Sequence, residues 1–109
     1  MKINKDDIGG ELIRDTHVYK VIDNKYLNNL TLSKTILNPL QQTGGHKHEG
    51  LEEVYFFIRG FGRMELDDEV IIVKGGDIVL IPDGAFHKVY NESHRETLEF
   101  NCVFQSYER

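Results

Sequence analysis

Residues 44–60 read GGHKHEGLEEVYFFIRG. Side chains alternate faces along a β-strand, so His46 and His48 project to one side while Lys47 points to the other. Both imidazoles can therefore meet one ion. Residues 53–58 are rich in β-branched and aromatic side chains and predict a strand that begins at Glu53.

A third histidine follows a strong turn signal. His87 lies in the stretch AFHKVY, just after Pro82-Asp83-Gly84. Proline fixes φ and glycine admits positive φ, so this stretch predicts a turn followed by a strand. Three imidazoles and the Glu53 carboxylate form a ligand set that suits a divalent transition metal. Because these residues fall on separate strands, we expect the fold rather than a local loop to build the site.

The remainder of the chain also reads as strands separated by turn signals. No apolar pattern of helical period persists beyond a turn, which favours an all-β sandwich or barrel. Only residues 1–16 leave room for a short helix. The 109 residues suffice for one domain with a single core. The expected strands span residues 18–22, 30–37, 45–48, 53–58, 62–66, 70–73, 78–81, 86–90 and 97–104.

Composition narrows the class of protein. The chain has 13 Lys and Arg against 18 Asp and Glu, a net charge of −5, and no basic cluster longer than a pair, which argues against a nucleic-acid partner. One cysteine, Cys102, rules out an intramolecular disulfide framework. No apolar stretch of membrane-spanning length and no leader segment is present, so we expect a soluble cytoplasmic protein.

The spacing of these residues resembles the two motifs of the cupin family, over residues 44–91. The first motif is a glycine, His-x-His, three or four residues, a glutamate, six residues and a glycine. His46, His48, Glu53 and Gly60 fit it, although its first glycine falls at Leu40. The second motif is a glycine, five residues, Pro-x-Gly, two residues, a histidine, three residues and an asparagine. The chain matches all of it with Gly76, Pro82, Gly84, His87 and Asn91.

The resemblance implies a double-stranded β-helix, or jelly roll, formed by residues 1–109 as one cupin domain. It also implies that His46, His48, Glu53 and His87 hold one divalent metal, which could be Mn, Fe, Ni, Co or Zn. Small cupins that look like this chain include sugar and sugar-phosphate isomerases. The family also contains dioxygenases, decarboxylases, epimerases and plain binders, and the fold alone does not choose among them.

Three functions stay open at this point. The first is a carbohydrate or sugar-phosphate isomerase, in which the metal polarises a carbonyl and stabilises an enediolate while a base moves the proton. Candidates for the base are Tyr55, His17 and Glu52. The second is an Fe(II)-dependent dioxygenase, and the third is a non-catalytic metal-dependent binding or sensing module. All three predict a small-molecule ligand and no nucleic-acid or membrane partner.

Strand alternation also predicts an assembly. If Glu53, Tyr55 and Phe57 face the interior, then Val54, Phe56 and Ile58 face outward. Residues 70–73 and 78–81 likewise carry apolar side chains on both faces, as in a sheet that is covered on both sides. We therefore expect a two-fold homodimer. A monomer whose N-terminal segment covers the outer face is the alternative.

Overall fold

The computed structural model describes residues 1–106, and this part of the chain consists of ten β-strands joined by turns. It contains no helix, and hence none that is long and apolar enough to cross a membrane. The strands are β1 (Glu11–Asp15), β2 (Tyr19–Asn24), β3 (Leu30–Leu37), β4 (His46–Lys47), β5 (Glu53–Arg59), β6 (Phe61–Leu66), β7 (Glu69–Lys74), β8 (Ile78–Ile81), β9 (Phe86–Asn91) and β10 (Leu98–Gln105).

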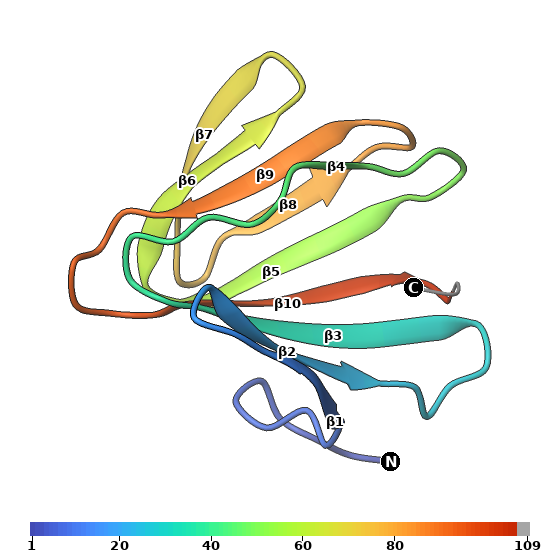
Figure 1. The fold of residues 1–109 in the computed structure, drawn as a ribbon. Helices are drawn as coiled ribbons and strands as arrows, with labels where there is room; N and C mark the ends of the chain where they lie inside the picture. Colours follow the sequence, from blue (N-terminus) through green and yellow to red (C-terminus); the bar gives the residue numbers. More distant parts are fainter. Residues whose placement is uncertain (107–109) are drawn as a thin grey trace.

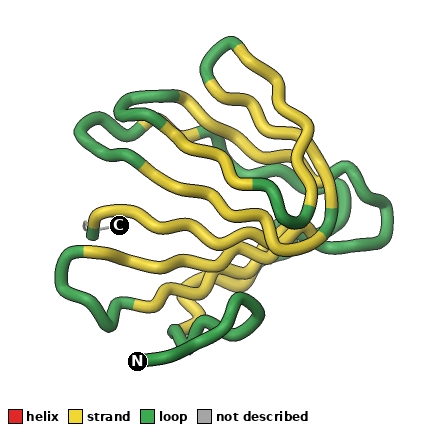
Figure 2. Tube along the Cα trace, turned by 180° about the vertical axis from the view of Figure 1, so that it is seen from behind, coloured by secondary structure: helices red, strands yellow, loops and turns green. Residues whose placement is uncertain are grey.

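The strands form two sheets in which every neighbouring pair is antiparallel. The larger sheet has the order β1-β2-β3-β10-β5-β8, and the smaller has the order β4-β9-β6-β7. Figure 1 shows that the sheets converge near the β5–β6 turn and diverge toward the end with the β4–β5 and β8–β9 turns. The view from behind shows the same opening (Figure 2). This architecture confirms the expected all-β jelly roll.

Strand alternation places the core as the sequence predicted. Glu53, Tyr55 and Phe57 of β5 are buried, whereas Val54 and Phe56 between them are exposed. Along β10, the four residues Leu98, Phe100, Cys102 and Phe104 are all buried on one face. The rings of Phe57 and Phe100, which are cross-strand neighbours, lie 5.3 Å apart on the inner face of the larger sheet. Burying one such side chain contributes roughly 1.5–3 kcal/mol, so this inner face holds the barrel together.

The short helix for which residues 1–16 left room does not form. Residues 11–15 form β1, which pairs with the edge of β2. Gly9 has a φ of 67°, and a Cβ on Gly10 would overlap the Asp23 backbone. The chain therefore enters β1 in an extended path that only these glycines permit.

The segment before β1 crosses the outer face of the larger sheet. The Lys5 carbonyl accepts hydrogen bonds from Lys34 Nζ at 2.8 Å and from Asn101 Nδ2 at 3.2 Å. The same Lys34 ammonium lies 3.6 Å from Glu99 Oε1. Ile8 is only 2% exposed. The N-terminal segment thus covers β3 and β10 on the side away from the barrel interior.

The glycines of the two sequence motifs have positive φ values. Gly60, Gly76 and Gly84 have φ values of 89°, 98° and 76°. Leu40, which stands where the first motif usually has glycine, has a φ of 60°. L-residues with a side chain pay for this left-handed region, whereas glycine enters it freely. Leu40 therefore differs from the motif in residue type but keeps the left-handed backbone conformation that favours glycine.

Candidate metal centre

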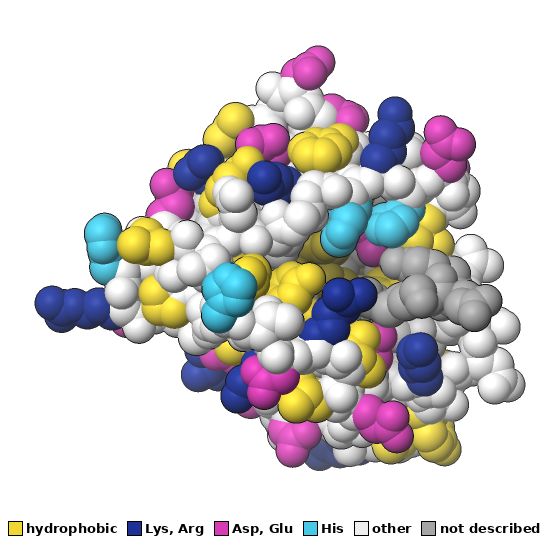
Figure 3. Space-filling view, in the orientation of Figure 1, with side chains coloured by type: hydrophobic (Ala, Val, Ile, Leu, Met, Phe, Trp, Pro, Cys, Tyr) yellow, Lys and Arg dark blue, Asp and Glu magenta, His cyan; other side chains and the backbone are white. Residues whose placement is uncertain are grey.

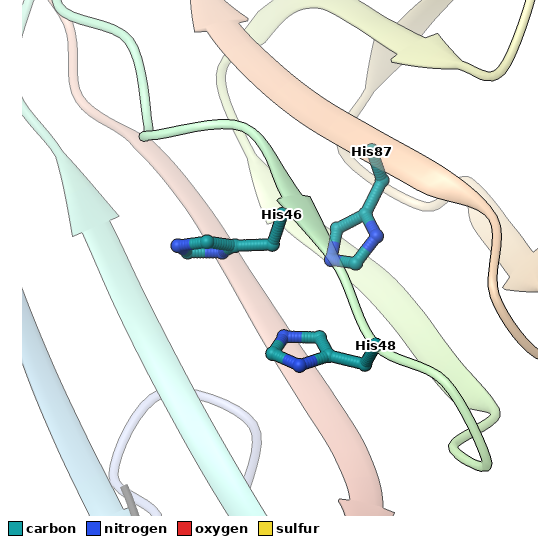
Figure 4. A group of neighbouring side chains, drawn as sticks. All are labelled: His46, His48 and His87. Carbon is teal, nitrogen blue, oxygen red and sulfur yellow. The ribbon is translucent and has the colours of Figure 1, made fainter.

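The candidate ligands come from two neighbouring strands of the smaller sheet and the first residue of β5. In the β4–β9 ladder His46 lies directly opposite His87. His48 follows β4 by one residue and projects to the same side as His46 (Figure 4). Glu53 opens β5 in the opposite sheet. Residues that are separated in the sequence by up to 41 positions thus meet across the barrel.

The three imidazoles form a close group. Each offers one ring nitrogen, and these three atoms lie within 4.8 Å of one another. The ring centroids of His46 and His48 are 5.6 Å apart, and that of His87 lies 6.1 and 5.9 Å from them. Exposure falls from His46, which is exposed, through His48 to His87, which is buried. The group therefore opens toward solvent on one side only.

Glu53 joins this group through His87. Its Oε2 atom lies 3.0 Å from His87 Nε2, and the two residues are 7% and 3% exposed. The separation is short enough for an ion pair, but the two atoms do not form a hydrogen bond and have no other hydrogen-bond partner in the described residues. Two buried polar atoms thus face each other without a proton directed between them. Such an arrangement is costly unless a cation satisfies both atoms.

The hydrogen bond of the second ring nitrogen of His87 shows which nitrogen is available to bind an ion. Nδ1 lies 3.2 Å from the Ala85 carbonyl oxygen. A carbonyl only accepts hydrogen bonds, so a neutral His87 carries its proton on Nδ1 and leaves the Nε2 lone pair available to an ion. A backbone carbonyl that accepts a hydrogen bond from the other ring nitrogen orients many metal-ligating histidines.

These distances fit a divalent ion. Metal–nitrogen and metal–oxygen bonds of about 2.1 Å place two ligand atoms at right angles about 3.0 Å apart. The His87–Glu53 separation has this value. Three imidazoles and a carboxylate also belong to the ligand types that bind Mn, Fe, Ni, Co and Zn. The residues present therefore fit the expected metal.

The histidines line a cavity of about 350 Å³, a size within the usual range for small-molecule sites. Figure 3 shows two histidine side chains above a hollow with hydrophobic side chains at its base, and basic side chains across from them. Phe100, Cys102 and Phe104 of β10 form part of the wall. Cys102 is buried on this face.

The three candidate bases occupy different places. Tyr55 lines the cavity, stacks on Phe100 at 5.2 Å and meets the His87 ring edge-on at 5.6 Å. His17 is exposed in the turn between β1 and β2, and Glu52 is exposed beside Glu53. Neither is among the described residues that line this cavity. Of the three, Tyr55 alone is placed to reach a ligand there.

Sequence reasoning missed the wall that faces the histidines. This wall comes from β1, β2 and β3 and contains Arg14, Tyr19, Ser33 and Thr35. Ser33 and Thr35 share a face of β3 by alternation, which the sequence did show. The missing signal was the strand that carries Arg14, in a segment for which the sequence favoured no strand.

Comparison with known proteins gives two similar sequences. An uncharacterized protein of Methanocaldococcus jannaschii is 35% identical over 101 residues, which cover 90% of this chain and 76% of that protein. An oxalate-binding protein of Thermotoga maritima is 33% identical over 67 residues, which cover 62% of this chain and 54% of that protein. The second match is thus confined to about half of the relative.

Solved structures share the fold. A Thermus thermophilus protein has a TM-score of 0.80 at 24% identity, covering 96% of this chain and 97% of that one. A predicted oxalate decarboxylase of Thermotoga maritima has a TM-score of 0.75 at 24% identity, covering 98% and 100%. KdgF from Halomonas has a TM-score of 0.76 at 15% identity, covering 96% and 94%.

The family itself is established by sequence. The Cupin_2 model, which describes a cupin domain, matches residues 34–104. This match spans the β3–β10 region and includes all four candidate ligands. A cupin fold with a three-histidine group indicates a metal site. The chain is therefore a member of the Cupin_2 family of cupin domains.

Proposed function

We propose that this cupin is a metal-dependent isomerase of a small hydroxy-carbonyl compound of the carbohydrate class. The observation that carries the proposal is the pair of buried, facing atoms His87 Nε2 and Glu53 Oε2, 3.0 Å apart at the wall of a cavity that also holds Tyr55. This arrangement supplies a place for an ion and an adjacent phenol. Isomerisation through an enediol needs both a polarised carbonyl and a group that moves a proton.

Four side chains would hold the ion, namely His46, His48, His87 and Glu53. A bound divalent ion supplies Lewis-acid polarisation of a carbonyl oxygen. The residues of the protein would supply the remaining chemistry. The Ala85 carbonyl keeps the His87 proton on Nδ1, and the apolar side chains of β10 exclude water from that side of the cavity.

Tyr55 is the residue that we assign to proton transfer between neighbouring carbons. Its ring is held from two sides, by Phe100 in a stacked contact with planes 18° apart and by His87 in an edge contact. A side chain fixed in this way loses little conformational freedom when it acts on a ligand. Proton transfer by a positioned side chain contributes about 10²- to 10⁴-fold to a rate.

A second candidate function is binding of a small dicarboxylate without turnover. The oxalate-binding relative favours it, because 33% identity extends over 67 residues of this chain. The same ligand set and cavity would serve that role. The two functions differ in what the protein does after the ligand is bound, and this difference is measurable.

The deciding experiment follows hydrogen exchange with solvent. The metal content is first measured by elemental analysis, and aldose, ketose and sugar-phosphate substrates are then incubated in D₂O and observed by NMR. An isomerase incorporates deuterium next to the carbonyl and consumes no oxygen. Binding without exchange would support the binding module, and oxygen uptake would support the dioxygenase.

Two variants separate the roles of the residues in this assay. Tyr55→Phe keeps both ring contacts, so metal content and KM should stay while kcat falls at least about 10²-fold. His48→Ala should lose metal and activity together while the apolar core keeps the fold. Full activity of Tyr55→Phe would exclude the phenol as the proton carrier.

A further inference from the structure

The wall opposite the histidines contains polar side chains that make no hydrogen bond to another described residue. Ser33 and Thr35 of β3 are 2% and 8% exposed and line the cavity. Within the described part of the chain, neither hydroxyl makes a hydrogen bond to another residue. Both side chains border the cavity, so their hydroxyls are available to a hydrogen-bonding ligand.

A neighbour on the same face of β3 shows the contrast. Thr31 is 1% exposed, and its Oγ1 lies 2.9 Å from Ser106 Oγ within hydrogen-bond distance. Thr31 does not line the cavity. The two hydroxyls of this face that bond to no other described residue thus lie at the cavity wall, whereas the Thr31 hydroxyl away from the cavity is paired.

Arg14 adds a charge to this wall. It is the one Lys or Arg among the described side chains that line the cavity, and no described carboxylate forms an ion pair with it. In the sheet register, Arg14 lies opposite Val21, and Val21 lies opposite Thr35. Two strand spacings, about 10 Å, therefore separate the backbones that carry Arg14 and Thr35. Arg14 is exposed, so it borders the cavity at its solvent-facing rim.

The charge of the complete cavity indicates the charge of its ligand. A divalent ion, the Glu53 carboxylate and the Arg14 guanidinium together leave two net positive charges, with the imidazoles neutral. One positive charge belongs to the metal end and one to the rim. A ligand with an anionic group at each end complements this distribution.

We infer that the cavity takes a polyhydroxylated acid with a second, distal anionic group, which Arg14 binds while Ser33 and Thr35 bind hydroxyls along the chain of the ligand. This inference rests on the proposed function, because both need a divalent ion at the metal end of the cavity, and that ion would hold the first anionic group. Arg14 is thus a specificity-determining residue. The distal group is a carboxylate or a phosphate, since a guanidinium binds either one.

The test uses four inert ligands and calorimetric titration of the metal-loaded protein. Gluconate and glucarate differ only at the distal end, where glucarate has a second carboxylate, and 6-phosphogluconate has a phosphate there. Oxalate probes the metal end alone. We expect glucarate or 6-phosphogluconate to bind about 10- to 100-fold more tightly than gluconate, as a charge-assisted hydrogen bond would provide. The more tightly bound of the two identifies the distal group.

Four variants test which residues produce the preference for a second anionic group. Arg14→Met should abolish it and leave the affinities for gluconate and oxalate unchanged, whereas Arg14→Lys should retain part of it. Lys20→Met removes a positive charge from an exposed residue of β2 that does not line the cavity, and it should leave the preference intact. Thr35→Val keeps the shape and should weaken gluconate binding without affecting oxalate.

The possible failures are distinguishable. If oxalate binds but the wild-type protein binds gluconate, glucarate and 6-phosphogluconate equally, the inference about Arg14 is overturned and the metal-dependent function stands. An equal loss in Arg14→Met and Lys20→Met would reduce the effect to net charge and would also overturn it. If the protein takes up no metal, the proposed function itself fails. If the loaded protein does not bind oxalate, the metal end holds no anionic group and the inference is overturned. Circular dichroism of each variant confirms that it is folded.

Discussion

The ring of Phe86 occupies the space in which a Cβ atom of Gly45 would lie. Gly45 directly precedes the strand of His46, and Phe86 directly precedes His87. The ladder also pairs Lys47 with Phe86 next to the pair of His46 with His87. The absent side chain at Gly45 thus lets the two strands with imidazoles approach each other.

Replacing Gly45 should disturb the metal centre more than the fold. In Gly45→Ala the new methyl group overlaps the Phe86 ring, so either the ring or β4 must move, and His46 moves with β4. We expect metal affinity to fall about 10-fold or more, as for other changes that misplace a ligand. Gly44→Ala is the control, since its Cβ would meet no atom closer than His46 Nε2 at 3.8 Å. Equal metal affinity of both variants in competition with a chelator would contradict this role of Gly45.

Leu40→Gly should stabilise the protein. Leu40 has a φ of 60° and is 55% exposed, so the substitution relieves backbone strain and loses little burial. The strain is worth roughly 1–2 kcal/mol and the added flexibility of the unfolded glycine offsets 0.5–1 kcal/mol of it. We expect a net gain of about 0.5–1 kcal/mol, measured by urea denaturation.

Asp67→Gly provides the matched comparison for Leu40. Asp67 also has a positive φ, of 51°, but its Oδ1 accepts a hydrogen bond from the Phe86 amide at 2.9 Å. Aspartate tolerates this region better than leucine does, and the lost hydrogen bond costs about 1 kcal/mol. This variant should gain no stability. A gain as large as that of Leu40→Gly would show that the hydrogen bond matters little.

Glu53→Gln should have opposite effects on the free and the metal-loaded protein. The glutamine amide can donate a hydrogen bond to His87 Nε2, where the carboxylate presents a second lone pair. We expect the free energy of unfolding of the metal-free variant to be about 1–3 kcal/mol larger than that of the metal-free wild type, so the variant should unfold at a higher temperature. With metal in excess the order should reverse, because the variant binds the ion more weakly. Calorimetry with and without chelator measures both; a lower melting temperature of the metal-free variant would refute the facing lone pairs.

We propose that the chain is a homodimer through an outer apolar patch formed by Val54, Phe56, Ile78 and Leu80. These residues are 39%, 37%, 56% and 69% exposed and are cross-strand neighbours, Val54 with Leu80 and Phe56 with Ile78. The N-terminal segment covers β3 and β10 on this side through Lys5, but it leaves the patch exposed. A contiguous apolar surface of this kind is typical of an interface.

Sedimentation equilibrium tests the patch directly. Phe56→Lys should shift the mass from two chains to one and leave metal content unchanged, because the side chain points away from the cavity. Ile72→Lys is the control, since Ile72 is 73% exposed on β7 in the other sheet. A wild-type mass of one chain would show that the patch remains exposed to water.

The alternation of β5 and the spacing of the histidines were readable from the sequence, because both depend on the two-residue period of a strand. Glu53, Tyr55 and Phe57 face inward as this period predicts, and His46 and His48 project to one side. The ligand types follow from residue chemistry alone. The sequence therefore determined the fold class and the candidate metal centre.

Strand neighbours were decided by the tertiary structure, because antiparallel pairing of β1 with β2 and of β3 with β10 depends on contacts between distant residues. No local pattern around Arg14 marks it as part of a cavity, and nothing in β3 alone leaves Ser33 and Thr35 without partners while Thr31 is paired. The metal end of the site is thus encoded by residue type and spacing. The end that selects the ligand arises only when β1, β2 and β3 are placed side by side, since burial and hydrogen-bond satisfaction are properties of the assembled sheet.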